Sequence, residues 1–429
     1  MRGAKERSLR IAVVGGGPAG SFFALYALKY AHAVGRDISV TIYEAKDFRR
    51  FGQPGCNMCA GLIPVTVLYR FRELGLAIPP EVILGHINAY SLHTSAGVLN
   101  ATQPDAHAEI VSVYRGAGPW HGRLLGQASF DALLLEEAVS RGARLRRSYV
   151  EAIRRDRPVE IVSGGETERF DLAVLASGLN GRPVSLPGFS YRPPPAGSMC
   201  QTELYLGEEE VQRRLGSSVH IFLPPEEIAT YGILIPKGSF ISASLLNARS
   251  QMRSMGQFLG LDEVKSVLGT QVRWSCGCLP KISVGLAQEL VDDGFVAVGD
   301  AGATRLYKNG IGSALVTAER AARTAIYRGC TKDDFAVSYL PLCRAIDQDN
   351  RIGRLLFLQV PLLKRFGPIP IAHDRIASGA NRHRAASELH TRILWGMFTG
   401  AYSYRQLFRM GMSPALLAQL ALALGRAIH

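Results

Sequence analysis

Four residues near the start of the chain have the types and spacing needed to hold a dinucleotide. Gly15, Gly17 and Gly20 stand in the turn GGGPAG, between the apolar run LRIAVV and the helix-type run SFFALYALKYA. Glu44 ends the next apolar run, ISVTIYE. In a strand–turn–helix–strand unit these glycines permit a tight turn, a close approach to a pyrophosphate and helix packing, and the acid can bind a ribose hydroxyl. The stretch therefore predicts a dinucleotide site.

A second strand–turn–helix pattern lies near residue 300. The segment DGFVAVGDAGATRLYKNGIGSALVTAERAARTAIYRG predicts a buried strand, then Gly299 and Asp300, then a long helix. Between the two blocks, SFDALLLEEAVSRGARL predicts a helix and RFDLAVLASGLNG a buried strand that ends in a turn at Gly178.

Two cysteine pairs form the other chemically suggestive set. Cys56 and Cys59 lie in GQPGCNMCAGLIP, and Cys276 and Cys278 lie in SCGCLP, about 220 residues further on. Four thiols could bind zinc or an iron–sulfur cluster, or form a redox disulfide, or pack as small apolar side chains near a cofactor. Because metal-site spacing is usually more local, we predict packing thiols and no metal.

Length and charge limit the class of protein. A chain of 429 residues is too long for one core, so two or three units are expected. The net charge is +13, and the segment from Arg344 onward has 12 Lys/Arg against 4 Asp/Glu. A C-terminal fifth that is both basic and apolar favours an anionic membrane surface as a binding partner. The sequence has no zinc-finger or RNP-type pattern, so nucleic acid is a less favoured partner.

No signal-peptide pattern and no membrane-spanning apolar run of about 18 residues is present in the sequence. We therefore expect a cytoplasmic protein that contacts the inner membrane surface peripherally through its C-terminal region. The helix predicted for SPALLAQLALALGRAI would lie on a membrane, close over a lipid pocket, or dock on the rest of the protein.

Together the blocks resemble the FAD-binding fold of the glutathione-reductase and p-hydroxybenzoate-hydroxylase type. The resemblance implies that the glycine turn holds the ADP half of FAD, that Asp300 binds the ribityl chain, and that the next helix points its N-terminus at the flavin ring. An arginine facing the cofactor is common in the family where this chain has Gln127, and Arg123 is the substitute. The full set of implied cofactor residues is Gly15, Gly17, Pro18, Ala19, Gly20, Glu44, Ala45, Cys59, Ala60, Gly61, Arg123, Gln127, Gly178, Gly299, Asp300, Gly310, Ile311 and Gly312.

Within that superfamily the chain is similar to the geranylgeranyl reductases, which saturate isoprenoid double bonds. The similar stretches are CAGLIP, YGILIPKG, CLPKISVGLAQELVDDGFVAVGDAG and LWGMFTGAYSYRQLFRMGMSPALL. The chain departs from the family in lacking a proline between Asp300 and the next glycines, and in lacking a tryptophan in YGILIP. The second departure changes the expected wall of the substrate pocket.

The resemblance implies hydride transfer from flavin N5 to an unactivated C=C bond, which needs a proton delivered to the other carbon. Cys59 and Tyr231 are the candidate catalytic residues. Tyr231, Tyr307 and Lys308 are the candidate substrate contacts. For Cys59 the alternative is packing against the flavin, for Tyr231 packing within a strand, and for Lys308 an exposed lysine. The electron donor would be NAD(P)H, bound transiently because the sequence has one dinucleotide fingerprint, or a ferredoxin-like protein.

The expected fold is α/β. An FAD-binding domain of the glutathione-reductase type comprises residues 1–60, 105–185 and 286–340. An inserted mixed or antiparallel sheet, from residues 61–104 and 186–285, binds substrate, and residues 341–429 form a helical C-terminus. The sheet should contain SMCQTELYLG, VHIFLP, ATYGILIPKG and FISASLLN. The alternative functions are an FAD monooxygenase that activates oxygen at flavin C4a, and a flavin-fold protein that binds lipid without redox chemistry.

Overall fold

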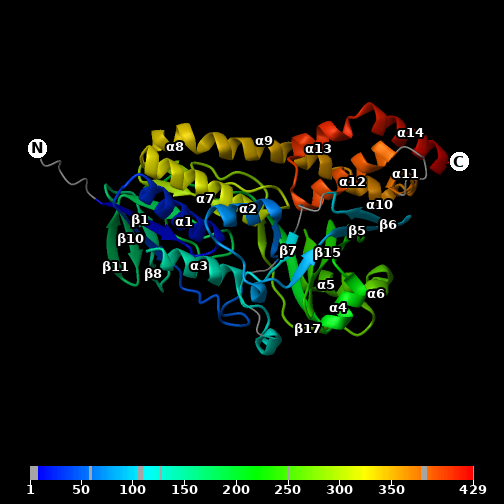
Figure 1. Cartoon of the computed structure of the whole chain (residues 1–429), viewed down its shortest axis with the longest axis horizontal. Coiled ribbons are helices and arrows are strands. Elements are labelled where there is room, and N and C mark those ends of the chain that lie inside the picture. Colours follow the sequence, from blue (N-terminus) through cyan, green and yellow to red (C-terminus); the bar gives the residue numbers. More distant parts are fainter. Residues whose placement is uncertain are drawn as a thin grey trace, which may run out of the picture.

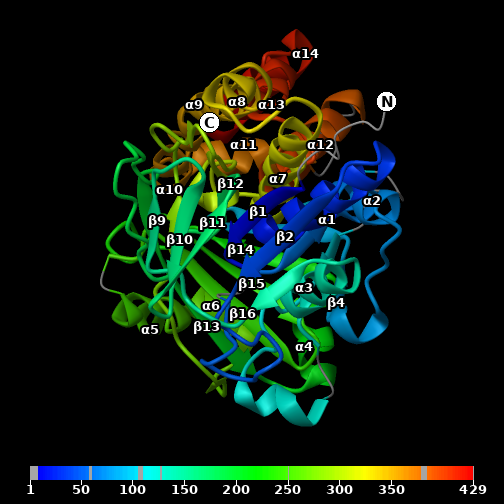
Figure 2. The ribbon, with the colours of Figure 1, turned by 90° about the vertical axis from the view of Figure 1, so that its left-hand side faces the viewer.

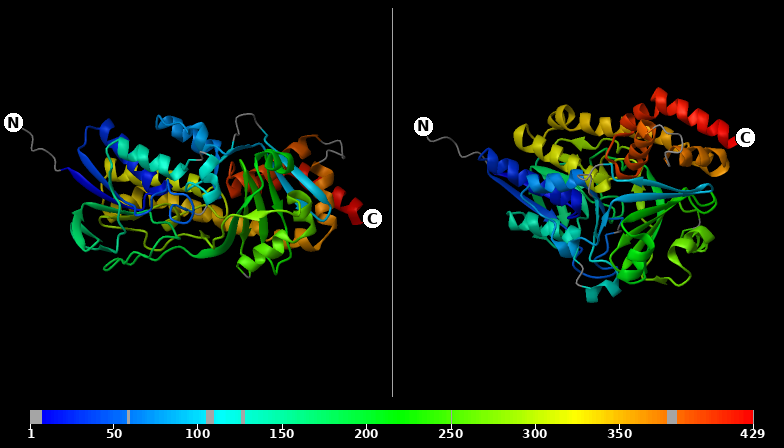
Figure 3. Two further views of the ribbon diagram at one scale, coloured as in Figure 1. Left: turned by 90° about the horizontal axis from the view of Figure 1, so that it is seen from below. Right: turned by 45° about the vertical axis from the view of Figure 1, so that its right-hand side comes forward.

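Two sheets of different character organise the chain and lie side by side along its long axis (Figures 1 and 3). The computed structural model describes residues 8–57, 60–104, 110–125, 128–249, 251–377 and 384–428. The N-terminal strands lie at one end of this axis, and the orange and red C-terminal helices lie at the other. The predicted α/β class with a helical C-terminus is confirmed.

The first sheet is parallel except at one edge. Its strands are β1 (Leu9–Val14), β2 (Ile38–Tyr43), β8 (Arg144–Arg146), β12 (Leu172–Leu175), β19 (Val291–Asp292) and β20 (Phe295–Ala297). Their order is β19–β20–β12–β1–β2–β8, and β19 runs antiparallel to its neighbour. β1 is almost wholly buried, as its apolar sequence LRIAVV requires for a strand covered on both faces.

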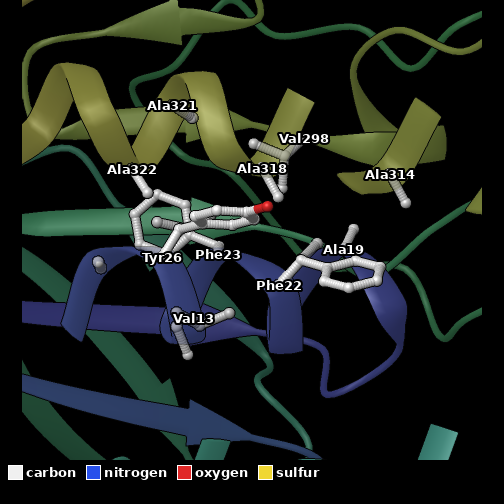
Figure 4. Packing of buried hydrophobic residues seen from close by; sticks show 14 of the residues in the cluster. Val13, Ala19, Phe22, Phe23, Tyr26, Val298, Ala314, Ala318, Ala321 and Ala322 are labelled. Carbon is white, nitrogen blue, oxygen red and sulfur yellow. The ribbon is translucent and has the colours of Figure 1, made fainter. Parts of the chain in front are cut away.

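Two long helices pack against each other beside this sheet (Figure 4). They are α1 (Pro18–Ala33) and α7 (Gly310–Tyr327), and α3 (Phe130–Ser140) also contacts α1. The α7 face toward α1 consists of small residues, including Ala318, Ala321 and Ala322, while α1 contributes Phe22 and Phe23, which have no exposed surface. The small side chains let the helices approach closely, and this fixes the start of α7 relative to the glycine turn.

Two small antiparallel sheets are also present, and Figure 2 shows one of them, in green, beside the first sheet. One contains β9 (Ala152–Arg154), β10 (Val159–Ser163) and β11 (Glu166–Phe170), and it packs on the first sheet through Phe170 and Tyr43, whose ring centroids are 6.2 Å apart. The other contains β3 (Leu62–Pro64), β7 (Ile110–Ser112) and β4 (Gly85–Ile87). The short helices between these strands are α2 (Val65–Glu73), η1 (Pro80–Val82) and η2 (Trp120–Leu125).

The second large sheet is mixed. Its strands are β5 (Ala89–Thr94), β6 (Gly97–Thr102), β13 (Ala196–Tyr205), β14 (Ser218–Phe222), β15 (Tyr231–Lys237), β16 (Phe240–Leu246), β17 (Arg273–Trp274) and β18 (Lys281–Ser283). The order is β17–β13–β16–β15–β14–β5–β6, with β18 paired to β13, and β14 runs parallel to β5. All four sequence stretches predicted for this sheet are in it. One face packs on α4 (Glu208–Leu215), α5 (Met252–Leu259) and α6 (Asp262–Leu268).

The C-terminal part of the chain is helical. The helices are α8 (Lys332–Ser338), α9 (Leu340–Phe357), α10 (Val360–Arg365), α11 (Pro368–Ala377), α12 (Arg384–Thr399), α13 (Tyr404–Gly411) and α14 (Pro414–Ile428). Trp395 of α12 is buried edge-on against Tyr90 of β5, so α12 covers part of the mixed sheet. In the described part of the chain no single helix is long and apolar enough to span a membrane. Two bent combinations, α9–α10 with α11 and α13 with α14, have the length and composition of a span when taken together. The division into domains stays a prediction.

Candidate functional site

One elongated cavity of about 480 Å³ runs from the glycine turn to the inner face of the mixed sheet. It brings together most of the predicted cofactor residues and all three predicted substrate residues. Those that line it are Gly15, Gly17, Pro18, Ala19, Glu44, Ala45, Ala60, Gly61, Gly178, Asp300, Gly310, Ile311, Tyr231, Tyr307 and Lys308. Segments that are far apart in the sequence therefore form one site.

Two of the predicted glycines in the turn, Gly15 and Gly20, have no room for a side chain. Gly15 has a φ of +108°, and a Cβ there would lie 2.6 Å from the carbonyl oxygen of Ala176. A Cβ on Gly20 would lie 1.9 Å from the carbonyl oxygen of Gly15. Gly17 is the N-cap of α1 and faces the cavity, so the free N–H groups at the start of this helix point toward any ligand there. A helix N-terminus with this exposure favours a phosphate.

Glu44 lies at the end of β2, where the sequence predicted a ribose-binding acid. One carboxylate oxygen accepts a hydrogen bond from the N–H of Gly16 at 2.8 Å, and the other accepts one from the N–H of Lys46 at 2.8 Å. These bonds hold the carboxylate at the cavity wall beside the turn. The remaining lone pairs are available to ligand hydroxyl groups.

Arg115, which the sequence reasoning missed, is the arginine beside the glycine turn. Its terminal nitrogen lies 3.8 Å from the place where a Cβ on Gly17 would stand. It donates hydrogen bonds to Asp131 at 3.1 and 3.3 Å, and Asn57 also donates to Asp131. Arg115 ends the apolar run IVSVYR. Its position at the end of this strand-like run is the sequence feature that could have identified it. By contrast, Arg123 is exposed and lines a second cavity, so the structure does not bring it to the turn.

A further pair was missed at the end of the cavity near Glu44. The guanidinium of Arg182 lies 4.3 Å from the ring centroid of Tyr149, and both residues line the cavity with Ser148 and Val150. Arg182 belongs to the loop after β12, and Tyr149 follows β8. The guanidinium is already stacked on the Tyr149 ring, so a planar ligand group would stack on the outer face of the pair.

The start of α7 forms the middle of the cavity. The Asn309 side chain caps the helix by accepting the N–H of Gly312 at 3.0 Å, while Gly310 and Ile311 line the cavity. Asp300 lies nearby in η3 (Gly299–Ala301). Burial raises the pKa of Asp300, and the charge of Arg115 acts in the opposite direction. The helix terminus would favour negative charge on a ligand.

Five further predicted cofactor residues are not part of the cavity lining that the structure describes. Gly20 packs on the turn, Gly299 packs on Ala19, and Gly312 lies against the Asn309 cap of α7. These three glycines let their own backbone lie close to the neighbouring residues, because a side chain at any of them would collide with those neighbours. Cys59 and Gln127 lie outside the described residues, so the catalytic role predicted for Cys59 stays a prediction.

No model of a known protein family and no curated protein sequence matches the chain. Solved structures do match. A geranylgeranyl bacteriochlorophyll reductase-like protein from Thermoplasma acidophilum has a TM-score of 0.65, covering 97% of this chain and 99% of its own at 14% identity. The flavin-dependent halogenase CmlS has a TM-score of 0.63, covering 94% and 76% at 18% identity. A variant of 2-methyl-3-hydroxypyridine-5-carboxylic acid oxygenase has a TM-score of 0.56, covering 90% and 97% at 14% identity.

The fold is that of FAD-dependent flavoproteins. The described residues also fit the cofactor of that fold. The α1 N-terminus and Arg115 provide N–H donors and a positive charge for a pyrophosphate, and Glu44 provides a carboxylate for a ribose. The predicted FAD-binding fold is therefore confirmed, while the reductase family within the superfamily is not decided by matches at this level of identity.

A strained loop joins η3 to α7 at the cavity wall. Tyr307 and Asn309 both have left-handed backbone, with φ of 55° and 51°. Such conformations cost of order 1–3 kcal/mol in non-glycine residues and persist only where the surroundings hold them. The C-terminal helices supply the support, since Tyr404 donates a hydrogen bond to the carbonyl of Leu306 at 2.6 Å and Arg305 donates one to the carbonyl of Gly400 at 2.6 Å.

Lys308 is buried, whereas the alternative considered from the sequence was an exposed lysine. Its Nζ donates to the carbonyl of Gly396 at 2.9 Å and lies 3.8 Å from the ring centroid of Tyr404. Burial lowers the pKa of Lys308 to about 7. The side chain thus anchors the strained loop to α12 and the turn that follows it, although the residue also lines the cavity.

The far end of the cavity is apolar. Its lining there comes from the mixed sheet, β7 and α12, and consists mainly of Tyr90, Ile110, Val219, Ile221, Ile233, Ile235, Leu246 and Phe398. Tyr231 lies at this end, stacked on Phe357, and burial raises the pKa of its hydroxyl. Ser244, opposite Ile233 in the sheet, lines the cavity and is 1% exposed, and its hydroxyl has no hydrogen-bond partner among the described residues. The sequence reasoning missed Ser244.

Three of the four cysteines singled out in the sequence line a single separate cavity. They are Cys56, Cys276 and Cys278. Among the described residues, no group of three or more His, Cys, Asp or Glu side chains could hold a metal ion, and no disulfide joins two described cysteines. The structure thus brings Cys56 and the distant pair to the same cavity, which the sequence spacing did not predict.

Proposed function

We propose that the chain is an FAD-dependent oxidoreductase that reduces C=C bonds of an isoprenoid or another apolar substrate. The observation that supports this best is the apolar end of the cavity, which opens directly from the start of α7, where the flavin ring would lie. Among the described residues, the only carboxylates that line the cavity are Glu44 and Asp300, and both lie toward the glycine turn and α7. A polar substrate would find few partners at the far end.

FAD would supply a hydride equivalent at its ring when bound and reduced. The chain supplies the binding and the charge stabilisation. The α1 N-terminus and Arg115 would hold the pyrophosphate, Glu44 a ribose, and Asp300 the chain that leads to the ring. The N–H groups at the start of α7 would stabilise negative charge on the reduced ring.

Tyr231 is the residue best placed to hold the proton that C=C reduction requires. Because burial raises the pKa of its hydroxyl, the group stays protonated at neutral pH. Tyr307 contributes to that shift and lines the cavity beside Tyr231, so the two hydroxyls lie at the same end of the substrate space. The aromatic rings of Tyr231 and Tyr307, which line the cavity and pack on Phe357, would also lie near positive charge that develops on the substrate carbon.

The test begins with the absorption spectrum of the purified protein, where a flavin band near ~450 nm is expected for bound FAD. The protein is then reduced without oxygen and mixed with a geranylgeranyl lipid, and the product is examined for saturated double bonds by mass spectrometry. A mass increase of two hydrogens per double bond is the expected result. In a parallel reaction supplied with isotope-labelled oxygen, incorporation of the label into the product would instead indicate a monooxygenase. A colourless protein that cannot be reconstituted with FAD would indicate a flavin-fold protein without redox chemistry.

A further inference from the structure

The amine of Lys308 is buried among neutral partners. The residue is 7% exposed, and its Nζ lies 2.9 Å from the carbonyl oxygen of Gly396 and 3.5 Å from that of Tyr402. Among the described residues, the lysines that pair with a carboxylate are Lys237, Lys265 and Lys332, and Lys308 is not one of them. A buried ammonium without a counter-charge is costly, so this site favours the neutral amine.

Two charged side chains act on this amine. Burial lowers the pKa of Lys308 to about 7, Arg305 acts in the same direction, and Asp349 of α9 acts against them. The Asp349 carboxylate already accepts the backbone N–H groups of Tyr404 and Arg405, both at 2.9 Å. The other titratable side chains around Lys308 are phenols, which carry no charge at neutral pH: Tyr231, Tyr307, Tyr402 and Tyr404.

Lys308 lies where a new charge on the flavin ring would act on it. It directly precedes Asn309, the N-cap of α7, and it lines the cavity together with Gly310 and Ile311. In the proposed function the ring lies at this helix start. Two electrons and one proton added to the ring leave one extra negative charge there. A negative charge near a buried lysine raises the pKa of that lysine, most strongly where water is excluded.

We propose that Lys308 takes up one proton from solvent each time the bound FAD is reduced, and gives this proton up when the substrate is reduced. The inference rests on the FAD site of the proposed function. The loop between η3 and α7 has no proline between Asp300 and Gly310, and it carries Lys308 instead. The amine would therefore store the proton that C=C reduction needs in addition to the hydride.

Atoms and charge balance through the cycle. Reduction brings two electrons from the donor and one proton to the ring, and a second proton from water to Nζ, so the site gains no net charge. In substrate reduction the π bond breaks, and the hydride, with both electrons, forms a C–H bond at one carbon. The O–H proton of Tyr231 forms a C–H bond at the other carbon. The proton of Lys308 then neutralises the phenolate, and the amine is neutral again.

Aromatic packing connects Lys308 with Tyr231. The Nζ of Lys308 lies 3.8 Å from the ring centroid of Tyr404. Phe357 packs on Tyr404, Tyr307 and Tyr231, with ring centroids 6.1, 5.0 and 6.4 Å apart. Tyr231, Tyr307 and Lys308 all line the cavity, so the amine and the phenol share one space. A proton that passes between them stays within this space.

The test measures the midpoint potential of the bound FAD against pH, in equilibrium with redox dyes. Between about pH 7 and 9 the wild type should take up two protons per two electrons. The reduction equilibrium then falls about 100-fold per pH unit, which is ~59 mV for a two-electron couple. Lys308→Met should take up one proton, with a fall of about tenfold or ~30 mV per pH unit.

Lys364→Met is the matched control. The Nζ of Lys364 also donates to a carbonyl, that of Ala229 at 3.0 Å, and burial lowers the pKa of Lys364, but this residue does not line the cavity. This variant should keep the two-proton slope. Lys308→Arg keeps a cation at every pH of the experiment. It should show the one-proton slope, with a higher potential than Lys308→Met.

A one-proton slope in the wild type, or a two-proton slope in Lys308→Met, would overturn the proposal. Flavin content and melting temperature show whether each variant is folded. If Lys308→Met does not bind FAD, the slopes of the wild type and Lys308→Arg decide. Absence of FAD from the folded wild type would refute the proposed function. A two-proton slope together with an oxygenated product would refute only C=C reduction and would support proton uptake by Lys308.

Discussion

Arg115 forms two hydrogen bonds, at 3.1 and 3.3 Å, with Asp131, a carboxylate that has no exposed surface. Asp131 lies in the first turn of α3, and Arg115 lies beside Gly17 at the start of α1. The pair therefore connects α3 to the place where a pyrophosphate would bind. Burial raises the pKa of Asp131, while Arg115 is the first of the opposing causes.

Asp131→Asn should destabilise the protein, because it leaves the Arg115 charge without this carboxylate. It should also weaken FAD binding, because Arg115 is then no longer held beside Gly17. Loss of one member of a buried pair costs about 3–5 kcal/mol in free energy of unfolding. Urea unfolding of the FAD-free protein measures the stability, and flavin titration measures the affinity.

The matched control is Glu73→Gln, which breaks the exposed pair of Glu73 with Arg70. Exposed pairs contribute about 1 kcal/mol or less. Equal losses for the two substitutions would show that the Arg115–Asp131 pair contributes no more than a surface contact.

Gly310→Ala tests whether the start of α7 faces the cofactor. Gly310 lines the cavity, and a methyl group added there would meet no described atom within 4 Å, so alanine should fold normally and project into the ligand space. We expect reduced flavin content, with stability unchanged or raised by up to about 1 kcal/mol, since alanine favours helix over glycine. Gly256→Ala in α5, where the methyl also meets no described atom, should leave flavin content unchanged. Normal flavin affinity in Gly310→Ala would place the cofactor elsewhere.

Lys308 should make stability depend on pH in the alkaline range. Its pKa is lowered to about 7 in the folded protein from 10.5, so the unfolded chain binds more protons between these values. Stability should therefore rise with pH from about 7 toward 10.5, by at most about 1.4 kcal/mol per pH unit from this group. Lys308→Met should flatten the slope in urea unfolding between about pH 7 and 9. An unchanged slope would mean that Lys308 stays charged in the folded protein.

Tyr231→Phe should slow substrate reduction without changing flavin content. Loss of a positioned proton donor costs about 10²–10⁴ in rate. The measurement is the rate at which substrate reoxidises the reduced protein in rapid mixing. Tyr307→Phe is the comparison, because its ring is retained against Phe357 and its hydroxyl lies at the same end of the cavity. If Tyr231→Phe reacts at the wild-type rate, then another group, such as Cys59, supplies the proton.

The C-terminal helices should bind anionic vesicles. Leu358 and Phe366, which flank α10, are 67% and 56% exposed, and Arg365 lies between them in the sequence. Exposed apolar side chains with neighbouring cations fit an anionic lipid surface. The double substitution Leu358→Ser and Phe366→Ser should reduce co-sedimentation with phosphatidylserine vesicles. Val337→Ser, at a position that is 62% exposed on α8, is the control. Equal sedimentation of both variants and the wild type would remove this membrane surface.

The dinucleotide unit could be predicted from local sequence. Gly15, Gly17, Gly20 and Glu44 lie within 30 residues, and their roles depend on one turn and two neighbouring strands. The four stretches of the mixed sheet were also predictable, since strand patterns are local. Such features follow from nearest-neighbour sterics and hydrophobic periodicity, which a single sequence displays.

Which distant residues share the site depends instead on the tertiary structure. Arg115 and Arg123 are only eight residues apart in the sequence. Hydrogen bonds to Asp131 hold Arg115 at the glycine turn, whereas Arg123 lines another cavity. Lys308 is buried because the carbonyls of two residues much later in the chain accept its hydrogen bonds. Cys56 and Cys276 line one cavity because a loop and a sheet edge meet there. Contacts of this kind depend on how whole elements pack, and no local pattern in the chain encodes that packing.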